Sequence, residues 1–367
     1  MRLALLTEIP APFRVPLWNA LAARADVELT VLLLAEHDPR RTYELHRDEW
    51  RFDAEVLPGR ELLLGRRWLV VSRRTRRRLA SIHPELVILG GWNEPAFLQA
   101  AWYARRRQIP YVSWVESTLW DERTRVVGLD LLKRRLLSSA GGVLVPGTAA
   151  ADYVRSLGVE SARIEVAPNG FDVAAFTRAV EEARSRREVL RRELAVERCL
   201  FLSVARLSPE KGTDLLTRAF AGVPADLVVV GDGPERPALE RLAPPNVRFV
   251  GRVGRDELPA WYATADAFAL ASRSETWGMA VAEAATVGLP IVVSHAVGAG
   301  WDLVEPGVSG FRVPVADEDG LRQALTAVAT DEAFRARASR RSRELAAGAT
   351  PEAWATAVAN LARRLLA

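Results

Sequence analysis

Short, uninterrupted apolar runs alternate with amphipathic segments along the first half of the chain. The apolar runs predict strands, and the segments between them, with apolar positions three and four apart, predict helices. The expected strands are 2–7, 27–35, 86–91, 110–117, 141–147 and 163–168, and the expected helices are 15–24, 70–83, 95–107, 126–140 and 148–158. Residues 36–67 are polar apart from a short candidate strand at 51–58, which indicates a long excursion over the surface.

The same alternation starts again after a charged stretch with helical spacing at 171–198. From Asp317 onward the chain is expected to be helical, and a break at 348–351 that contains Gly and Pro separates a last helix from the rest. Strands that are apolar throughout and separated by helices are typical of parallel sheets covered on both faces. The expected strands of this half are 199–207, 226–234, 246–253, 266–272 and 288–294.

These patterns predict an α/β protein made of two doubly wound, Rossmann-like domains that face a central cleft. We expect an N-terminal domain at 1–170, a C-terminal domain at 171–348, and a helix at 349–367 that could pack back on the N-terminal domain. A chain of 367 residues exceeds one core of ordinary size, which also favours two domains. In open sheets of this kind ligands bind at the carboxyl ends of the strands, so the loops that follow the strands carry the candidate chemistry.

Charge and composition restrict the classes of site and partner. The formal net charge is +4, and the basic excess belongs to residues 1–170, with 25 basic and 20 acidic residues against 25 and 26 in 171–367. The single cysteine, Cys199, excludes an internal disulfide and a cysteine-rich metal site, and the four histidines are too scattered to favour a metal cage. The arginine clusters lack interleaved aromatic residues, which argues against a nucleic-acid partner.

The same composition bears on location. No apolar run approaches the ~18–20 residues of a membrane span, and the apolar start of 1–12 is too short for a signal peptide. We expect a cytoplasmic protein that could contact the inner face of the cell membrane through its basic N-terminal half. The leucines and cations of 131–137, which include Lys133, and the five arginines of 73–78 would suit anionic lipid. A solvated arginine face is the alternative.

Two carboxylates eight residues apart stand in a strand, loop, helix, strand unit at 266–294. Glu275 falls in the loop, Gly278 at the start of the helix, and Glu283 about five residues further, roughly 7–8 Å along the axis at ~1.5 Å per residue. The free N–H groups and the positive dipole end of the helix can hold a phosphate between the two acids. This row suits a nucleotide sugar, with hexose hydroxyls, diphosphate and ribose hydroxyls in turn.

The alternative is that both glutamates are solvated surface charges. Small apolar neighbours at 280–285 indicate instead that Glu283 is buried. A buried carboxylate is seldom left unpaired, so we prefer a ligand site.

The loops after the first two strands of the second half carry further candidates. Arg206 and Lys211 lie on either side of a turn, so both can face one anion. Lys211 is one of only two lysines among fifty basic residues, which singles it out. Gly231 and Gly233 give the next loop the backbone freedom for a ligand to lie close. A solvated turn and a plain glycine turn are the respective alternatives. No GxGxxG fingerprint occurs, which argues against nicotinamide binding.

Taken in order, the motifs of these loops carry a resemblance. They are APNGFD at 167–172, VARLSPEKG at 204–212, GDGPERPALE at 231–240, VRFVGRV at 247–253, SETWGMAVAEA at 274–284 and GLPIVV at 288–293. The series resembles the C-terminal domain of retaining glycosyltransferases of the GT-B fold, the GT4 family, and the resemblance covers nearly the whole chain. Each motif alone is weak, but the set is highly specific.

The resemblance implies a nucleoside-diphosphate-sugar donor held mainly by the C-terminal domain, and hexose transfer with retention of configuration and without a metal ion or other cofactor. The implied roles are diphosphate binding by Arg206 and Lys211, hexose binding by Glu275, ribose binding by Glu283, backbone contact with the phosphate at Gly278 and Met279, and contact with the base near Val253. Among these, Glu275, Arg206 and Lys211 are the candidate catalytic residues.

The sequence departs from the family pattern in two loops. TEIPAPFR at 7–14 replaces the usual Gly-rich loop of the first domain, so Arg14 could substitute for it at the diphosphate. Thr276 and Trp277 stand where Gly and an aromatic residue are common.

Candidates on the acceptor side come from the N-terminal half, and Arg14 belongs to them. Glu116, beside Trp114, stands at a strand end where many relatives carry a histidine near the donor sugar, and it could instead cap the next helix. Trp92 could stack on a sugar and Asn93 could hydrogen-bond it, while a Gly-Gly turn with an N-cap from Asn93 is the even alternative.

We therefore expect a GT4-like hexosyltransferase that acts on a saccharide, lipid-linked or small-molecule acceptor in polysaccharide or glycoconjugate biosynthesis. One alternative is another GT-B enzyme, such as a nucleotide-sugar epimerase or a phosphorylase. A phosphorylase would need a cofactor lysine, whereas Lys211 already lies in the candidate turn. A nucleotide-sugar-binding regulator without turnover is the alternative from another class, and the presence of both acids and both cations argues against it.

Overall fold

The computed structural model describes residues 1–39, 45–64, 67–121 and 129–367. Its first sheet has the strand order β3-β2-β1-β6-β7-β8-β9, with parallel pairing throughout. The strands are β1 (Arg2–Thr7), β2 (Glu28–Leu33), β3 (Asp53–Val56), β6 (Leu86–Leu89), β7 (Tyr111–Trp114), β8 (Gly142–Val145) and β9 (Ile164–Val166). The order reverses beside β1, so the loops after β1 and β6 diverge at the carboxyl edge.

The second sheet is also parallel, in the order β12-β11-β10-β13-β14-β15. Its strands are β10 (Cys199–Val204), β11 (Ala225–Val230), β12 (Val247–Gly251), β13 (Ala267–Leu270), β14 (Ile291–Ser294) and β15 (Gly310–Val313). Here the order reverses between β10 and β13, which therefore neighbour each other although β11, β12 and three α-helices lie between them in the chain.

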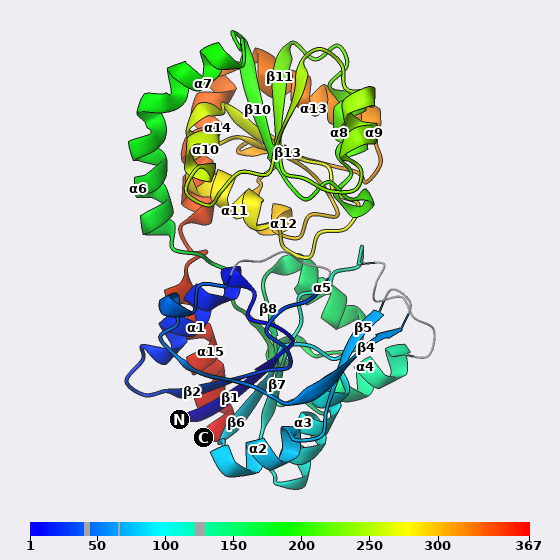
Figure 1. Cartoon of the computed structure of the whole chain (residues 1–367), viewed down its shortest axis with the longest axis vertical. Coiled ribbons are helices and arrows are strands. Elements are labelled where there is room, and N and C mark those ends of the chain that lie inside the picture. The colour runs from blue at the N-terminus through cyan, green and yellow to red at the C-terminus, as the bar shows by residue number, and fades with distance from the viewer. Residues whose placement is uncertain (40–44, 65–66, 122–128) are drawn as a thin grey trace.

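Helices cover both faces of each sheet, and the carboxyl edges of the two sheets face each other (Figure 1). In the first half the helices are α1 (Val15–Ala22), α2 (Thr75–Ile82), α3 (Pro95–Arg106), α4 (Leu129–Ser138) and α5 (Thr148–Ser156). In the second half they are α6 (Val173–Ala183), α7 (Arg187–Glu193), α8 (Thr213–Ala219), α9 (Arg236–Leu242), α10 (Leu258–Thr264), α11 (Met279–Thr286), α12 (Gly300–Leu303), α13 (Glu318–Thr330), α14 (Glu332–Ala346) and α15 (Pro351–Leu366). The predicted fold class of two doubly wound α/β domains is confirmed.

Three strands lie where the sequence patterns predicted none. The helix expected at 70–83 begins only at Thr75, because the residues before it form β5 (Arg67–Ser72), which pairs antiparallel with β4 (Gly59–Leu64). Burial of Trp68 and Val70 on one face of β5 explains this strand. At the other end of the chain, β15 adds a sixth strand to the second sheet from a region with no expected element.

The charged stretch 171–198 is not an open linker. Its helices α6 and α7 pack against α10 of the second domain, and Phe176 meets Tyr262 edge-on at 5.4 Å. Before α6 the chain passes from the first domain to the second at Gly170, where an added Cβ would lie 2.8 Å from Ala349 O of the returning segment. The two connections between the domains therefore touch each other.

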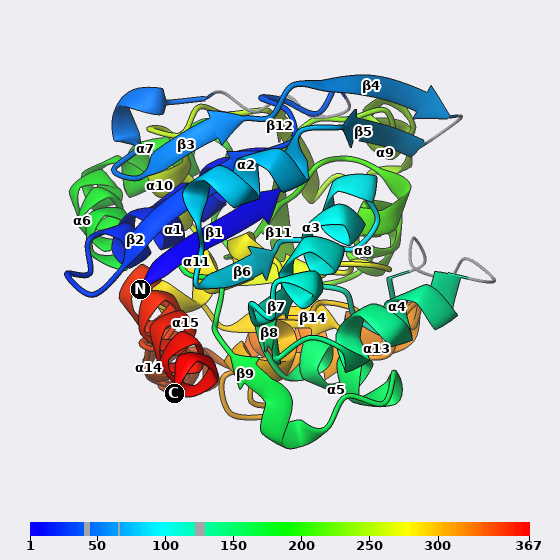
Figure 2. The same ribbon diagram turned by 90° about the horizontal axis from the view of Figure 1, so that it is seen from below.

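The last helix, α15, returns to the first domain. It packs against α1 and against the first sheet at β8 and β9, and it buries Trp354 in that core beside Trp114, at 5.1 Å between ring centroids. Figures 1 and 2 show the helix running along the first domain to the side where the chain begins. The first domain is thus built from both ends of the chain.

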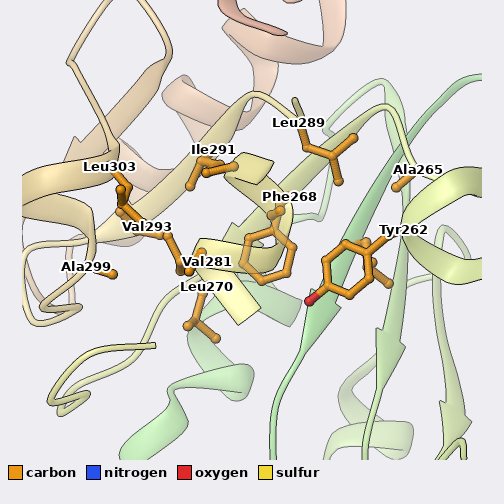
Figure 3. Packing of buried hydrophobic residues seen from close by; sticks show 14 of the residues in the cluster. Tyr262, Ala265, Phe268, Leu270, Val281, Leu289, Ile291, Val293, Ala299 and Leu303 are labelled. Atoms are coloured by element: carbon orange, nitrogen blue, oxygen red, sulfur yellow. The ribbon is translucent and has the colours of Figure 1, made fainter. Parts of the chain in front are cut away.

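An apolar core behind α11 fixes the helix that begins at the candidate anion site. Val281 of α11 packs with Phe268 of β13 and Ile291 of β14, and all three side chains are fully buried. Figure 3 shows this cluster, with the Tyr262 hydroxyl at its margin. The core leaves the first residues of α11 at the carboxyl edge of the sheet.

Candidate active site between the facing sheet edges

Lys211 and Glu275 meet at the carboxyl edge of the second sheet. Lys211 lies in the turn after β10 and Glu275 in the loop after β13, and Lys211 Nζ forms an ion pair with Glu275 Oε2. Only 20% and 17% of the two side chains are exposed, so the pair is weakly screened by solvent. Backbone hydrogen bonds hold Glu275 in place, from Glu275 N to Ala296 O at 3.1 Å and from Gly298 N to Glu275 O at 3.0 Å. The structure thus unites two of the candidate catalytic residues.

Gly212 sets the position of Lys211. Its φ of 61° is left-handed, and an added Cβ would overlap Ala271 O in the loop after β13. A glycine is therefore needed both for the conformation and for the close packing of the two loops. This approach brings the Lys211 turn within reach of the Glu275 loop.

The start of α11 lies beside Glu275. Gly278 is the N-cap residue, with a φ of 104°, and it offers no side chain to cap the helix. An added Cβ at Gly278 would stand 3.3 Å from Glu275 Cγ. The backbone N–H groups at the start of α11, from Met279 onward, carry the positive end of the helix dipole to this point. A cation, an acid and a helix N-terminus are therefore side by side.

Glu283 lies in the second turn of α11, partly buried, and has a partner that the sequence patterns did not reveal. Tyr262 of α10 donates its hydroxyl to Glu283 Oε2 at 2.6 Å. Burial raises the pKa of the Glu283 carboxyl above its ordinary value, and the Tyr262 hydrogen bond offsets part of this rise. Burial and the neighbouring carboxyl also raise the pKa of Tyr262 well above its ordinary value, so it remains a donor. The expectation that this carboxylate is not left unpaired is met by Tyr262.

Arg206 shares the turn with Lys211 but makes local contacts. Arg206 Nε donates to Ser208 Oγ at 3.3 Å, and Arg206 Nη2 lies 3.6 Å from Glu210 Oε1. The Ser208 hydrogen bond and the charges of Arg206 and Lys211 hold the pKa of Glu210 below its ordinary value, although burial opposes them. Arg206 is more than half exposed and does not contact the Lys211–Glu275 pair.

The glycines after β11 are explained by backbone packing. An added Cβ at Gly231 would overlap Ala205 O, and one at Gly233 would overlap Leu207 O. The loop after β11 therefore lies directly on the Arg206 segment, and ligand contact at Gly231 and Gly233 stays a prediction. Val253, after β12, packs on the core next to α11.

On the opposite edge, Arg14 and Glu116 form the centre of a polar cluster. Arg14 Nη2 donates to Glu116 Oε2 at 2.9 Å and Arg14 Nη1 to Thr7 Oγ1 at 2.9 Å, while Asn169 Nδ2 donates to Glu116 Oε1 at 3.0 Å. The guanidinium of Arg14 also lies 4.7 Å from the Trp114 ring centroid. Both Glu116 oxygens are engaged by these side chains rather than by a helix N-terminus. Within the described residues, Arg14 Nε and Asn169 Oδ1 are buried without a hydrogen-bond partner.

The loop after β6 places Asn93 and Trp92 differently from one another. Asn93 does not cap α3, whose N-cap residue is Glu94, and its Nδ2 donates instead to Glu8 Oε1 at 2.8 Å.

Trp92 is partly exposed, and Lys133 Nζ lies 4.2 Å from its ring centroid. Lys133 is only 2% exposed, so the expectation that it belongs to a basic surface is wrong. Its ammonium faces Trp92 and the Tyr153 hydroxyl because α4 turns this side inward.

Two family models match the chain, one in each domain. Residues 14–170 match the model described as "Glycosyl transferase 4-like domain", and residues 186–345 match "Glycosyl transferases group 1". Together they cover both sheets and the site between them. The chain belongs to the GT4 family of glycosyltransferases, with the GT-B fold.

Several relatives and solved structures are similar to this GT4 protein. It is 35% identical over 274 residues to the D-inositol 3-phosphate glycosyltransferase of Xylanimonas cellulosilytica, and the aligned region covers 68% of this chain and 64% of that protein. It is 34% identical over 211 residues to a GDP-mannose-dependent alpha-mannosyltransferase of Mycobacterium tuberculosis, and the aligned region covers 57% of this chain and 53% of that protein. The matched regions thus span between about half and two thirds of these relatives.

The fold likeness extends further than the sequence likeness. The crystal structure of Anabaena Alr3699/HepE in complex with UDP aligns with a TM-score of 0.78 and 21% identity, over 98% of this chain and 99% of that one. At this identity the likeness shows the GT-B fold alone.

One departure from the GT4 pattern, Trp277, lies where the two domains touch. Trp277 is 4% exposed and packs on Gly147 of the first domain, and Asp302 accepts hydrogen bonds from Thr148. Neither contact was predicted, because Asp302 and Thr148 come from segments with no motif and pair only through the fold. The expectation that Arg14 substitutes for the Gly-rich loop stays a prediction, since Arg14 is engaged by Glu116.

Two further observations concern metals and membranes. Within the residues that the structure describes, no group of three or more His, Cys, Asp and Glu side chains is arranged to hold a metal ion. In the same residues, every helix is too short or too polar to cross a bilayer.

Proposed function

We propose that this GT4 protein moves a hexose from a nucleoside-diphosphate-sugar donor to a saccharide, lipid-linked or small-molecule acceptor, with retention of configuration and without a metal ion or other cofactor. The observation that carries the proposal is the Lys211–Glu275 pair beside the start of α11, at the point where the strand order reverses. The names of similar proteins support the donor class, since one is GDP-mannose-dependent and another was solved with UDP.

The donor would lie along α11. Its diphosphate oxygens would accept from Lys211 Nζ and from the N–H groups at the start of the helix, which favour an anion. Glu275 would accept from hexose hydroxyls on one side of the diphosphate. Glu283, held by Tyr262, would accept from ribose hydroxyls on the other side. Arg206 is exposed enough to turn toward the same diphosphate without losing a buried contact.

The chemical step exchanges one bond for another at the anomeric carbon. The bond between C1 and the β-phosphate oxygen breaks, and the acceptor oxygen bonds to C1 on the same face. The acceptor proton passes to the departing phosphate oxygen, so no protein base is needed. Lys211, Arg206 and the helix dipole stabilise the negative charge that develops on the diphosphate, which is the expected large catalytic contribution.

The acceptor would be held by the first domain. The Arg14–Glu116–Asn169 cluster keeps one buried donor, Arg14 Nε, and one buried acceptor, Asn169 Oδ1, unused among the described residues. A hydroxyl-rich ligand can satisfy both at once. Trp92 and Asn93, on the neighbouring strand end, would add an aromatic surface and an amide.

We also propose peripheral contact with anionic membrane through the outer face of α4, with the enzyme at the inner face of the cell membrane. Leu131 is 76% exposed, and Arg134 and Arg135 on the same helix are exposed as well. Exposed leucine beside arginine suits insertion between anionic headgroups. Replacing Leu131 by Glu should abolish co-sedimentation with phosphatidylserine vesicles. Retention of the variant on such vesicles, or binding of the wild type to phosphatidylcholine alone, would contradict this surface.

A thermal-shift screen with UDP, GDP, TDP, ADP and their sugars tests the donor class first. A nucleotide bound by the folded state raises the melting temperature by linkage, so one base should stand out. The selected donor is then incubated with an acceptor panel, and release of nucleoside diphosphate is followed with and without EDTA. The proposal expects release that depends on acceptor and is unchanged by EDTA.

Other outcomes separate the alternatives. Conversion of the donor to its epimer without diphosphate release would favour an epimerase. Tight binding without product over the whole panel would favour a regulator. The anomeric configuration of the product, measured by NMR from the C1–H coupling, decides retention, and an inverted product would overturn that part of the proposal.

A further inference from the structure

Helix α5 of the first domain is capped by a side chain of the second. Gly147, its N-cap residue, has no side chain, while the Asp302 carboxylate accepts from Thr148 N at 3.1 and 3.2 Å and from Thr148 Oγ1 at 2.7 Å. A carboxylate here satisfies a free N–H group and interacts favourably with the helix dipole. The helix is therefore completed only when α12, which carries Asp302, lies against it.

Gly147 provides the space for this contact. Its φ of 178° is extended backbone that any residue adopts, so the lack of a side chain matters for volume alone. An added Cβ would overlap Asp302 Oδ2 and lie 2.7 Å from Trp277 Cζ3. Two side chains of the second domain thus close over the backbone of one residue of the first. A larger residue at this position would displace the Asp302 carboxylate and the Trp277 ring.

The same two side chains belong to one backbone unit with Glu275. Gly298 N donates to Glu275 O at 3.0 Å, and Ala299 N donates to Trp277 O at 2.8 Å. The segment that makes these bonds runs directly into α12 and Asp302. Through these hydrogen bonds, a displacement of Trp277 or Asp302 would also displace the loop that holds Glu275.

A second contact between the domains lies beside this one. Trp120 of the first domain stacks on Trp301 of α12 with ring centroids 5.6 Å apart and 24° between planes. Trp301 is itself fixed by a hydrogen bond from its Nε1 to His295 O at 2.9 Å and by the Arg312 guanidinium, 4.5 Å from its ring centroid. The stack holds α12 in the orientation that Asp302 needs.

We propose that Gly147, Thr148 and Asp302 are positioning residues of an interdomain latch, which sets the Glu275 loop when the two domains close. The kinetic part of this proposal rests on the proposed transferase function, whereas the closing itself rests on the geometry. The nucleotide contacts proposed for Glu283 come from α11, one helix away from the latch. The latch therefore acts on the hexose end of the donor.

The burial of the Asp302 carboxylate works against the latch. Burial raises the pKa of its carboxyl above the ordinary value, and Asp152 adds to the rise, although the Thr148 hydrogen bonds and the Arg312 charge oppose it. The cost of burying the charge thus opposes the contribution of the hydrogen bonds.

Small-angle scattering tests the closing. The wild type is measured with and without the nucleoside diphosphate selected by the thermal-shift screen, and Gly147→Ala is measured in parallel. Gly348→Ala is the matched control, because an added Cβ there meets nothing within 4 Å. We expect a larger radius of gyration for Gly147→Ala than for the wild type and the control, with an unchanged melting temperature. Identical profiles for all three proteins would overturn the latch.

Kinetics test the positioning. Asp302→Asn and Thr148→Val should lower kcat at least tenfold while the Kd for nucleoside diphosphate changes less than twofold, and Thr148→Ser, which keeps the hydroxyl, should recover most of kcat. Equal losses in the Ser and Val variants, or wild-type kcat in Asp302→Asn, would overturn the role. If the wild type transfers no sugar from any donor, the proposed function fails, and the scattering comparison still decides the latch.

Discussion

Lys211 and Glu275 stand 64 residues apart in the chain and form an ion pair because β10 and β13 are neighbours in the sheet. The pair keeps two charges together that the proposed donor would separate. Diphosphate oxygens compete for the ammonium, and hexose hydroxyls compete for the carboxylate. Replacement of Lys211 and replacement of Glu275 should therefore have different effects on nucleotide affinity and on turnover of the sugar donor.

Lys211→Met should weaken nucleoside diphosphate binding by about tenfold to a hundredfold, because a largely buried charge-assisted contact contributes about 1.5–3 kcal/mol. Glu275→Gln should leave that affinity within about threefold and lower turnover of the sugar donor by at least tenfold. Calorimetric titration with the nucleotide and initial rates with the donor separate the two effects. Arg322→Met, on the distant helix α13, serves as the control for removal of a cation. Equal losses of affinity in both variants would show that the division of labour is wrong.

Glu283 gives the nucleotide affinity a pH dependence. Its pKa is raised in the folded protein, so the carboxylate that ribose hydroxyls need is lost at a higher pH than for an ordinary glutamate. Affinity for nucleoside diphosphate should fall as the pH drops from 8 to 5, measured by titration at each pH. In Glu283→Gln the dependence should flatten, and Tyr262→Phe should move it to higher pH because one opposing hydrogen bond is gone. If the pH dependence is the same in the wild type, Glu283→Gln and Tyr262→Phe, then other groups cause it.

The same group affects stability with the opposite sign. A carboxyl whose folded-state pKa is raised contributes stability that is fully present below its unfolded pKa and is lost as the pH rises through the folded value. Without nucleotide, Glu283→Gln should therefore gain melting temperature relative to the wild type at pH 8 and lose this advantage at pH 4. Scanning calorimetry at both pH values checks the sign.

Gly212→Ala should be among the more destabilising glycine replacements. The left-handed φ costs about 1 kcal/mol for alanine, and the overlap with Ala271 O adds backbone displacement, for a total of about 2–4 kcal/mol. Gly222→Ala separates the two contributions, because Gly222 has a φ of 84° with nothing within 4 Å of an added Cβ. Urea unfolding should show a clearly larger loss for Gly212→Ala. Equal losses would mean that the loop yields without cost.

Trp354→Ala should destabilise the first domain. The side chain is fully buried between α15 and the first sheet, and truncating a buried tryptophan costs about 3–5 kcal/mol. Trp102→Ala is the matched control, because Trp102 is exposed and should lose little. Thermal unfolding, followed by far-ultraviolet circular dichroism of the backbone, measures the stability of both variants. A small loss for Trp354→Ala would mean that α15 adds little to the first core.

The fold followed from the sequence wherever apolar runs were continuous and buried on both faces. Strands such as β1 and β10 and the whole unit from β13 to β14 are of this kind, because burial alone decides them. The hairpin of β4 and β5 was missed because its apolar run at 68–71 leads directly into the amphipathic pattern of α2, and because its pairing is antiparallel. The edge strand β15 is short and only half buried, so its pattern resembles a loop.

The site followed from the sequence to the extent that loops after neighbouring strands must meet. Lys211, Glu275 and the start of α11 are brought together by strand order, which the pattern indicates. The hydrogen bond from Tyr262 to Glu283 could not be predicted, because a tyrosine on an amphipathic helix usually belongs to the hydrophobic core. Asn169 was not singled out within its motif, and its bond to Glu116 depends on how the chain leaves the first domain.

The return of α15 to the first domain decides where motion of the protein can be seen. Met1 and Ala367 lie on the same side of that domain (Figures 1 and 2), and Arg363 Nη2 donates to Asp26 Oδ2 at 2.6 Å to tie the two terminal regions together. Fluorophores attached at both termini would stay at a fixed separation through every turnover. A reporter pair needs one dye on the helices around β11 or β12, and its partner can then sit at either terminus.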